Sequence, residues 1–86
     1  MRTHELNIDK EYADAVLSGE KPFEVRRNDR GYQKGDLIKF KVTDGTYSKV
    51  YHKLDEKIFK ITYLMHGFGL EDRWCVFGIK KVDDEN

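Results

Sequence analysis

The amino-acid sequence predicts a mainly β domain of the α+β class, a small barrel of about five to six strands with one N-terminal helix covering a barrel mouth. One stretch near the start has apolar residues at helical spacing, and six short segments have the character of strands. Turn-forming Gly, Asn and Asp residues separate these segments. A sheet closed into a barrel has fewer exposed strand edges than an open sheet, and this number of short strands therefore favours a barrel.

The first part of the chain predicts a strand followed by the helix. Residues 3–8 alternate between two faces, and His4 shares a face with apolar side chains, which indicates a buried, hydrogen-bonded histidine. Asp9 then offers an N-cap oxygen to a helix over residues 9–18. The apolar stripe of this helix consists of Tyr12, Ala13, Val16 and Leu17. Gly19 is a natural residue to end it, since helices often close on a left-handed glycine.

Five further strands are predicted after the helix. They cover residues 23–26, 37–43, 47–54, 57–65 and 74–81. Asp44 and Gly45 are a strong hairpin signal, so the segment that follows them is expected to return as a strand beside residues 37–43. Cys75 lies inside the last apolar segment, where we expect a small core side chain rather than a nucleophile.

Composition and charge limit the classes of function. The 86 residues form a single expected domain, residues 1–86, and sixteen basic residues balance sixteen acidic ones, so no global cationic field attracts polyanions. The longest uncharged apolar stretch is too short to cross a bilayer, and the N-terminus lacks a signal-peptide core. A single cysteine precludes an internal disulfide. We therefore expect a cytoplasmic protein that binds no membrane, metal ion or other cofactor, with a monomer favoured over an oligomer.

The charge is nevertheless distributed unevenly along the chain. Residues 21–41 hold seven basic residues against three acidic ones. A local positive cluster allows a neutral protein to meet phosphate. Arg27, Arg30 and Lys34 in this segment are therefore candidate phosphate contacts, although a solvated face of mixed charge would show the same composition.

Three polar residues that follow the helix form the main candidate site. Glu24 and Arg26 share one face of the expected strand, opposite Phe23 and Val25, and Lys21 stands at the junction of helix and strand. A carboxylate accepts hydrogen bonds from exocyclic amines, whereas a guanidinium or an ammonium donates to carbonyl oxygens, ring nitrogens or phosphate. The trio therefore suits recognition of a polar heteroaromatic group. The alternative is an exposed salt-bridge ladder without function.

The spacing Gly19-x-Lys21-x-x-Glu24-x-Arg26, directly after the helix, resembles the hallmark motif of the ASCH domains, which belong to the PUA-like superfamily. The resemblance extends over essentially the whole chain and is greatest to short bacterial and phage domains of unknown function. The resemblance implies a β-barrel with a pocket beside the first helix, and binding of RNA or of a modified nucleobase. Carried over to this sequence, the pocket-lining residues are Lys21, Glu24 and Arg26, with Asn28, Asp29 and Phe68 as rim members.

Two other functions remain open at this point. Some ASCH domains are amidohydrolases that remove the acyl group of N4-acetylcytidine, and in these a lysine acts with a threonine three residues later. Here Lys21 is retained but Glu24 occupies the threonine position, so a Glu24-activated water would have to replace the hydroxyl. The third alternative is an accessory module whose barrel face binds another protein, and a large exposed apolar patch would indicate it.

Overall fold

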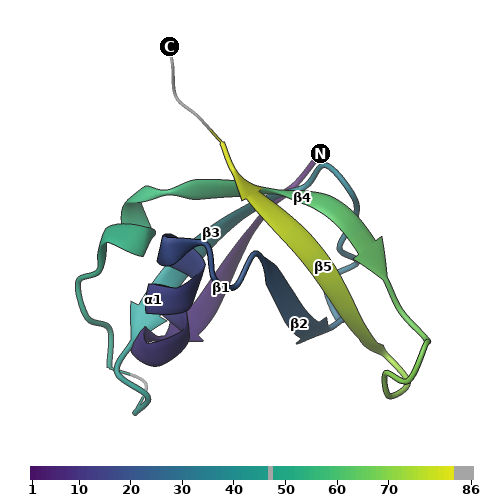
Figure 1. Cartoon of the computed structure of the whole chain (residues 1–86), viewed down its shortest axis with the longest axis horizontal. Helices are drawn as coiled ribbons and strands as arrows, with labels where there is room; N and C mark the ends of the chain where they lie inside the picture. Colours follow the sequence, from purple (N-terminus) through teal and green to yellow (C-terminus); the bar gives the residue numbers. More distant parts are fainter. Residues whose placement is uncertain (47, 83–86) are drawn as a thin grey trace.

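The computed structural model describes residues 1–46 and 48–82, which form one sheet of five strands with one α-helix and one 3-10 helix (Figure 1). In chain order the elements are β1 (Thr3–Asp9), α1 (Lys10–Ser18), β2 (Phe23–Arg27), β3 (Leu37–Thr43), η1 (Lys53–Glu56), β4 (Ile58–Met65) and β5 (Trp74–Lys81). The expected mainly β class with one N-terminal helix is confirmed.

The strand order in the sheet is β1-β3-β4-β5-β2. β1 and β3 are parallel, because α1 and β2 lie between them in the chain, and every other pair is antiparallel. The sheet is strongly curled, so that it forms a half-barrel whose two edge strands, β1 and β2, are not paired with each other (Figure 1). The curvature brings the two edge strands, β1 and β2, towards each other and leaves an opening beside α1.

The helix begins and ends close to the predicted positions. Gly19 adopts φ +91°, and its N–H donates to the Val16 carbonyl, which closes the last turn in the left-handed conformation that glycine adopts easily. Ala13 and Val16 are buried against the end of the sheet, whereas Tyr12 and Leu17 of the same expected stripe are partly exposed. Asp9 makes no side-chain cap bond. No helix in the part of the chain that the structure describes has the length and hydropathy to cross a membrane.

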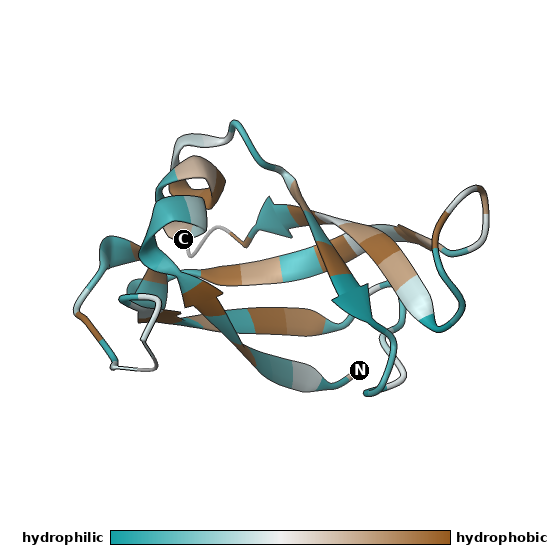
Figure 2. Cartoon of the chain, turned by 90° about the horizontal axis from the view of Figure 1, so that it is seen from below, coloured by the Kyte–Doolittle hydropathy of each residue, from teal (hydrophilic) through white to brown (hydrophobic). Residues whose placement is uncertain are grey.

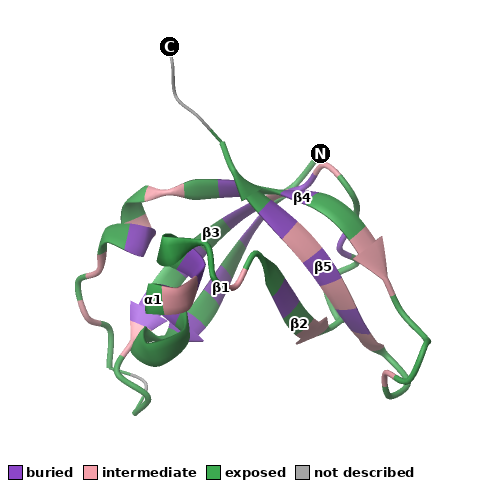
Figure 3. Cartoon of the chain, in the orientation of Figure 1, coloured by how far each residue is buried: buried purple, intermediate pink, exposed green. Residues whose placement is uncertain are grey.

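The core lies on the concave side of the sheet, between the sheet and α1. Buried and exposed residues alternate along the strands (Figure 3), and the apolar positions form bands along them (Figure 2). The fully buried large side chains are Leu6, Ile38, Phe40, Val42, Leu54, Ile61, Cys75 and Phe77. Cys75 is thus a core side chain as expected, and burial raises the pKa of its thiol, which disfavours a nucleophilic thiolate.

The strand predicted over residues 47–54 is wrong. Tyr47 lies outside the described residues. The rest of the segment does return beside β3, through a bridge between Lys49 and Thr43 and a hydrogen bond from the Val50 N–H to the Val42 carbonyl, but it forms no strand. The N–H of Val42 donates to the Asp55 carboxylate at 3.1 Å, where a hairpin partner would have offered a carbonyl. Leu54 is buried within η1, so the segment enters the core as a helical turn instead of extending the sheet.

Candidate functional site

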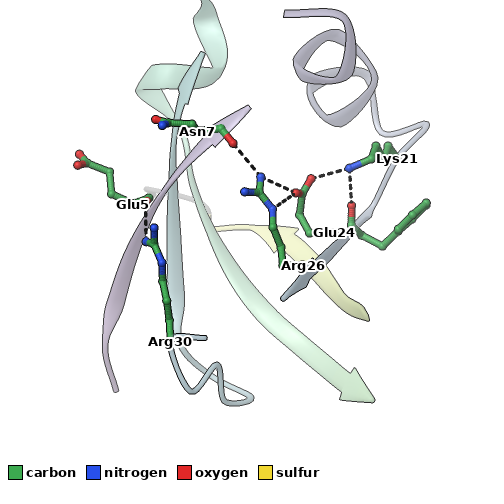
Figure 4. A network of polar contacts seen from close by, with 7 residues as sticks. Glu5, Asn7, Lys21, Glu24, Arg26 and Arg30 are labelled. Carbon is green, nitrogen blue, oxygen red and sulfur yellow. Dashed lines mark hydrogen bonds and ion pairs between the residues drawn. The ribbon is translucent and has the colours of Figure 1, made fainter. Parts of the chain in front are cut away.

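Arginine side chains span the opening between the two edge strands, β1 and β2. The guanidinium of Arg26 donates to the Asn7 carbonyl at 2.9 Å, and that of Arg30 donates to the Glu5 carbonyl at 2.8 Å (Figure 4). Both carbonyls belong to the edge of β1 that faces away from β3, where a further strand would otherwise be needed to satisfy them. The half-barrel is therefore closed by side chains instead of by backbone pairing.

The residue at the centre of this opening is Glu24, which is only 2% exposed. Its Oε2 accepts from the Lys21 ammonium at 2.6 Å, and its Oε1 accepts from the Arg26 Nε at 2.9 Å (Figure 4). A carboxylate buried in this way requires paired charges and hydrogen bonds, and two cations supply them. The three residues of the predicted trio therefore meet in one ion cluster, the Lys21–Glu24–Arg26 cluster.

Local backbone structure places Lys21 and Arg26 on either side of Glu24. The N–H of Lys21 donates to the Ala15 carbonyl at 3.0 Å, so the end of α1 determines where its side chain starts. Its ammonium also donates to the Phe23 carbonyl at 3.1 Å. Arg26 follows Glu24 by two residues in β2, and side chains two apart on a strand share a face.

The face of β2 that turns inward is the polar one. Glu24 points into the concave side, whereas Phe23 and Val25 are 40% and 43% exposed on the convex side. The alternation in the sequence correctly predicted that the polar pair shares a face. Simple hydrophobic patterning would have buried the other face, and the ion cluster at the open edge of the barrel explains the inversion.

A cleft of about 430 Å³ opens over this cluster, between the N-terminal end of α1, the end of β1 and β2. Its lining residues are Asn7, Ile8, Asp9, Tyr12, Lys21, Glu24, Val25, Arg26, Arg27 and Trp74. Lys21 and Arg26 are 23% and 25% exposed, so both cations reach the cleft, while Glu24 lies beneath them. The predicted pocket beside the first helix is present, with all three trio residues in its lining.

The cleft is rich in hydrogen-bond donors. Both oxygens of Glu24 already accept from the flanking cations, so the carboxylate has little capacity left for a ligand. Lys21 has three N–H donors and makes two hydrogen bonds, and within the described ranges no partner contacts the Nη1 group of Arg26. The site is therefore suited to a ligand that offers acceptors, such as carbonyl oxygens, ring nitrogens or phosphate oxygens.

The expected rim residues lie away from the cleft. Asn28 accepts from the Tyr32 N–H through its side chain and lines a separate cavity beside the β4–β5 loop, while Asp29 is exposed outside the cleft lining. Phe68 is 89% exposed in that loop, with a φ of +54°. Phe68 is thus an exposed aromatic residue, but it does not line the cleft.

The three candidate phosphate contacts are separated in the structure. Arg27 lines the cleft. Arg30 bonds to the backbone of β1, and its own carbonyl accepts from the Arg2 guanidinium, so it serves to close the barrel. Lys34 lines a different cavity, together with Lys60, Lys80 and Lys81.

Two contributors to the cleft were not predicted from the sequence to line it. Asn7 takes part through its backbone carbonyl, and no side-chain pattern signals that role. Trp74 stands in register with Arg27, because β2 and β5 pair antiparallel, and sequence alone does not show that the first and last parts of the chain are neighbours. Trp74 is half-buried, so part of its ring is accessible.

At the opposite end of the barrel a second polar pair is a structural feature. His4 is buried, as predicted, and its Nε2 lies 2.8 Å from the Asp36 carboxylate. Burial by itself would raise the pKa of Asp36, but hydrogen bonds from His4 and from the backbone N–H groups of Arg2 and Gln33 outweigh it, so the pKa is lowered. The pair fixes the loop before β3 to β1.

These features define a class of small α+β domain, a half-barrel with one helix and a cation-lined cleft at its open edge. Residues 3–79 match the family model described as "Domain of unknown function (DUF3850)", and the chain belongs to that family. It is 34% identical over 64 residues to an "Uncharacterized 12.9 kDa protein in GpA 3'region" of Escherichia phage P2, a match that covers 73% of this chain and 57% of the relative. The chain thus matches just over half the length of that relative.

A solved structure has a similar fold. The crystal structure of hypothetical protein PH0355 superimposes with a TM-score of 0.61, covering 95% of this chain and 100% of the other at 15% sequence identity. At that identity the similarity concerns the fold alone.

Proposed function

We propose that this domain is an ASCH-type, PUA-like module that binds RNA or a modified nucleobase in the cleft over the Lys21–Glu24–Arg26 cluster. The observation that carries the proposal is the burial of Glu24 beneath two partly exposed cations. A surface salt-bridge ladder contributes little and leaves its carboxylate in water. Here the carboxylate is removed from water and holds two partly exposed donors at the wall of a cleft, where they are preorganised for a ligand that offers acceptors.

In this proposal Lys21 and Arg26 contact the ligand and Glu24 positions them. Arg26 is fixed by Glu24 and by the Asn7 carbonyl, which leaves its Nη1 edge to donate to a base carbonyl, a ring nitrogen or a phosphate. Lys21 supplies a second donor nearby. The exposed part of Trp74 offers an apolar surface on which a base can stack, and Arg27 at the same side of the cleft is suited to phosphate.

Hydrolysis of an N4-acylated cytidine is the enzymatic alternative, with Lys21 and Glu24 as its candidate catalytic residues. It has less support from the geometry. No serine or threonine occurs in the lining of the cleft formed by the described residues, and both Glu24 oxygens are engaged by cations, which weakens this group as a base for water. Chromatography of N4-acetylcytidine incubated with the protein tests it, and loss of the acyl group that Lys21→Ala abolishes would establish the enzyme.

The binding proposal is tested by a thermal-shift screen with free nucleosides and a ten-nucleotide single-stranded RNA, followed by calorimetry. A ligand that binds only the folded state raises its melting temperature. We expect Lys21→Ala to abolish binding and Lys53→Ala, a lysine on η1 outside the cleft, to leave it unchanged. Equal affinities in the two variants, or no binding of any probe to the wild type, would overturn the proposal.

A further inference from the structure

The convex face of β2, β5 and β4 is not covered by any element that the structure describes. Residues paired across antiparallel strands share a face, so the register defines what this surface presents. Phe23 pairs with Gly78 and Gly78 with Tyr63, and the next row consists of Val25, Val76 and Met65. Lys80 and Lys60 follow at one end, and Trp74 and Arg27 at the other.

Aromatic side chains are accessible along this face. Phe23 is 40% and Tyr63 65% exposed, and Trp74 is half-buried. Six residues separate the rows of Trp74 and Lys80, which at about 3.3 Å per residue makes the strip about 20 Å long. Phe23 and Tyr63 flank Gly78 in one row and Trp74 lies four residues, or about 13 Å, further along β5, so the face offers stacking surfaces for bases of a single strand at both places.

Basic residues lie at both ends of the aromatic strip and no acidic residue lies within its paired rows, while Glu71 and Asp72 line a cavity with Trp74 beyond one end. None of the outward positions in the paired parts of β2, β5 and β4 is Asp or Glu. Beyond Tyr63, a cavity of about 510 Å³ has four lysines among its lining residues, and the register places two of them, Lys60 and Lys80, on the convex face. The four lysines are Lys34, Lys60, Lys80 and Lys81. The positive charge favours a polyanion as the partner over a protein surface that has few acidic residues.

The strip is continuous with the cleft. Val25, Arg27 and Trp74 lie on the convex face and also line the cleft, because β2 is an edge strand and the cleft opens around it. The Lys21 ammonium lies 5.3 Å from the centroid of the Phe23 ring, so the same lysine touches the cluster and the strip. If one base of a nucleic-acid strand occupies the cleft, the neighbouring nucleotides can therefore follow β5.

We infer that the convex face of β2, β5 and β4 binds the nucleotides that flank the base held in the cleft, and that the ligand is a single-stranded nucleic acid rather than a free nucleoside. Phe23, Tyr63 and Trp74 stack on bases. Arg27 and the lysines of the cavity contact phosphates. This inference rests on the proposed function for the identity of the ligand, but it concerns a different surface.

The test compares variants on the two surfaces with the same probe, a fluorescein-labelled ten-nucleotide single-stranded RNA of mixed sequence, by anisotropy. Tyr63→Ala should weaken binding about five-fold or more through loss of stacking. The double variant Lys60→Gln with Lys80→Gln should lower the slope of log affinity against log salt by about 1.4, because each lost phosphate contact accounts for about 0.7. Tyr51→Ala and Lys53→Gln, exposed positions near η1, are the matched controls and should change neither quantity.

Each outcome separates the two proposals. Loss of affinity in both Lys21→Ala and Tyr63→Ala supports both surfaces. Loss in Lys21→Ala alone, with an unchanged salt slope in the double lysine variant, overturns the strip and leaves the cleft. Loss in the strip variants alone overturns the cleft. A fourth outcome is a wild-type protein that does not bind the RNA but sediments as a dimer, which Tyr63→Asp converts to a monomer. This would show that the face binds a second copy of the chain and would overturn the inference.

Discussion

Replacing Glu24 by glutamine tests whether the ion cluster is a structural unit of the barrel. The amide has nearly the shape of the carboxylate, so the change creates no cavity. It removes the negative charge between Lys21 and Arg26, and it turns one oxygen that accepts a hydrogen bond into an NH₂ group that faces a cation. The two cations then repel each other across a neutral side chain.

The size of the effect follows from the burial of the three groups. A hydrogen bond to a charged partner contributes about 1.5–3 kcal/mol. Because Lys21 and Arg26 are 23% and 25% exposed, water screens part of the interaction, and we expect a loss of about 1.5–2 kcal/mol, at the lower end of that range. For a domain of 86 residues this corresponds to a melting temperature lower by about 6–16 °C.

Thermal unfolding followed by circular dichroism measures this shift, with Glu5→Gln as the control. Glu5 also pairs with a lysine, Lys41, but at 3.7 Å and with side chains 58% and 48% exposed. Such a surface pair contributes about 0.2–1 kcal/mol, so the melting temperature of the Glu5→Gln variant should fall by only about 1–8 °C, less than that of Glu24→Gln. Equal shifts in the two variants would refute the reasoning that burial makes the Glu24 cluster different.

Three further predictions concern the closure and stability of the fold. Arg30→Ala should lower the free energy of unfolding by about 1 kcal/mol, because it removes the donor to the Glu5 carbonyl. It should also speed hydrogen exchange of the β1 amides, and unchanged exchange would contradict closure of the barrel by side chains. Because the pKa of Asp36 is lowered in the folded state, its contribution to stability is present above the unfolded pKa near 3.8 and is lost as the pH falls through the folded pKa. Asp36→Asn should therefore flatten the acid side of the plot of unfolding free energy against pH. An equally steep loss of stability in acid in the variant would count against the pair with His4. Gly19→Ala should destabilise by about 1–2 kcal/mol in urea titrations because φ is +91°, and an unchanged midpoint would contradict the left-handed cap.

Periodic patterns in the sequence predicted most of the secondary structure. Residues 74–81 were predicted as a strand with its observed bounds, and buried and accessible positions alternate there over the first seven residues. The helix was predicted to within one residue, since Gly19 has a steric reason to end it. The turn after Gly45 does bring the chain back beside β3, with one bridge and two backbone hydrogen bonds, but no strand follows because the Asp55 side chain takes the Val42 N–H, an exchange that no local pattern signals.

The candidate site was predictable as a set of residues but not as a geometry. The two-residue repeat of a β-strand puts Glu24 and Arg26 on the same face, yet it does not show which face of an edge strand turns inward. The inversion of β2 depends on Lys21 and Asn7, which reach Glu24 and Arg26 from other elements. The convex strip likewise depends on strand order, because its aromatic residues come from positions 23, 63 and 74 of the chain.

The most direct test of ligand binding in the cleft is a heteronuclear NMR titration with the ten-nucleotide RNA, observing the Arg26 Nε–H group and the backbone amides of Asn7 and Lys21. Because Arg26 is already held by Glu24 and by the Asn7 carbonyl, a ligand at its free edge must change the environment of all three signals together. We predict saturable shifts at these positions with one common affinity. Saturable binding of the RNA that leaves the three signals in place would contradict the account.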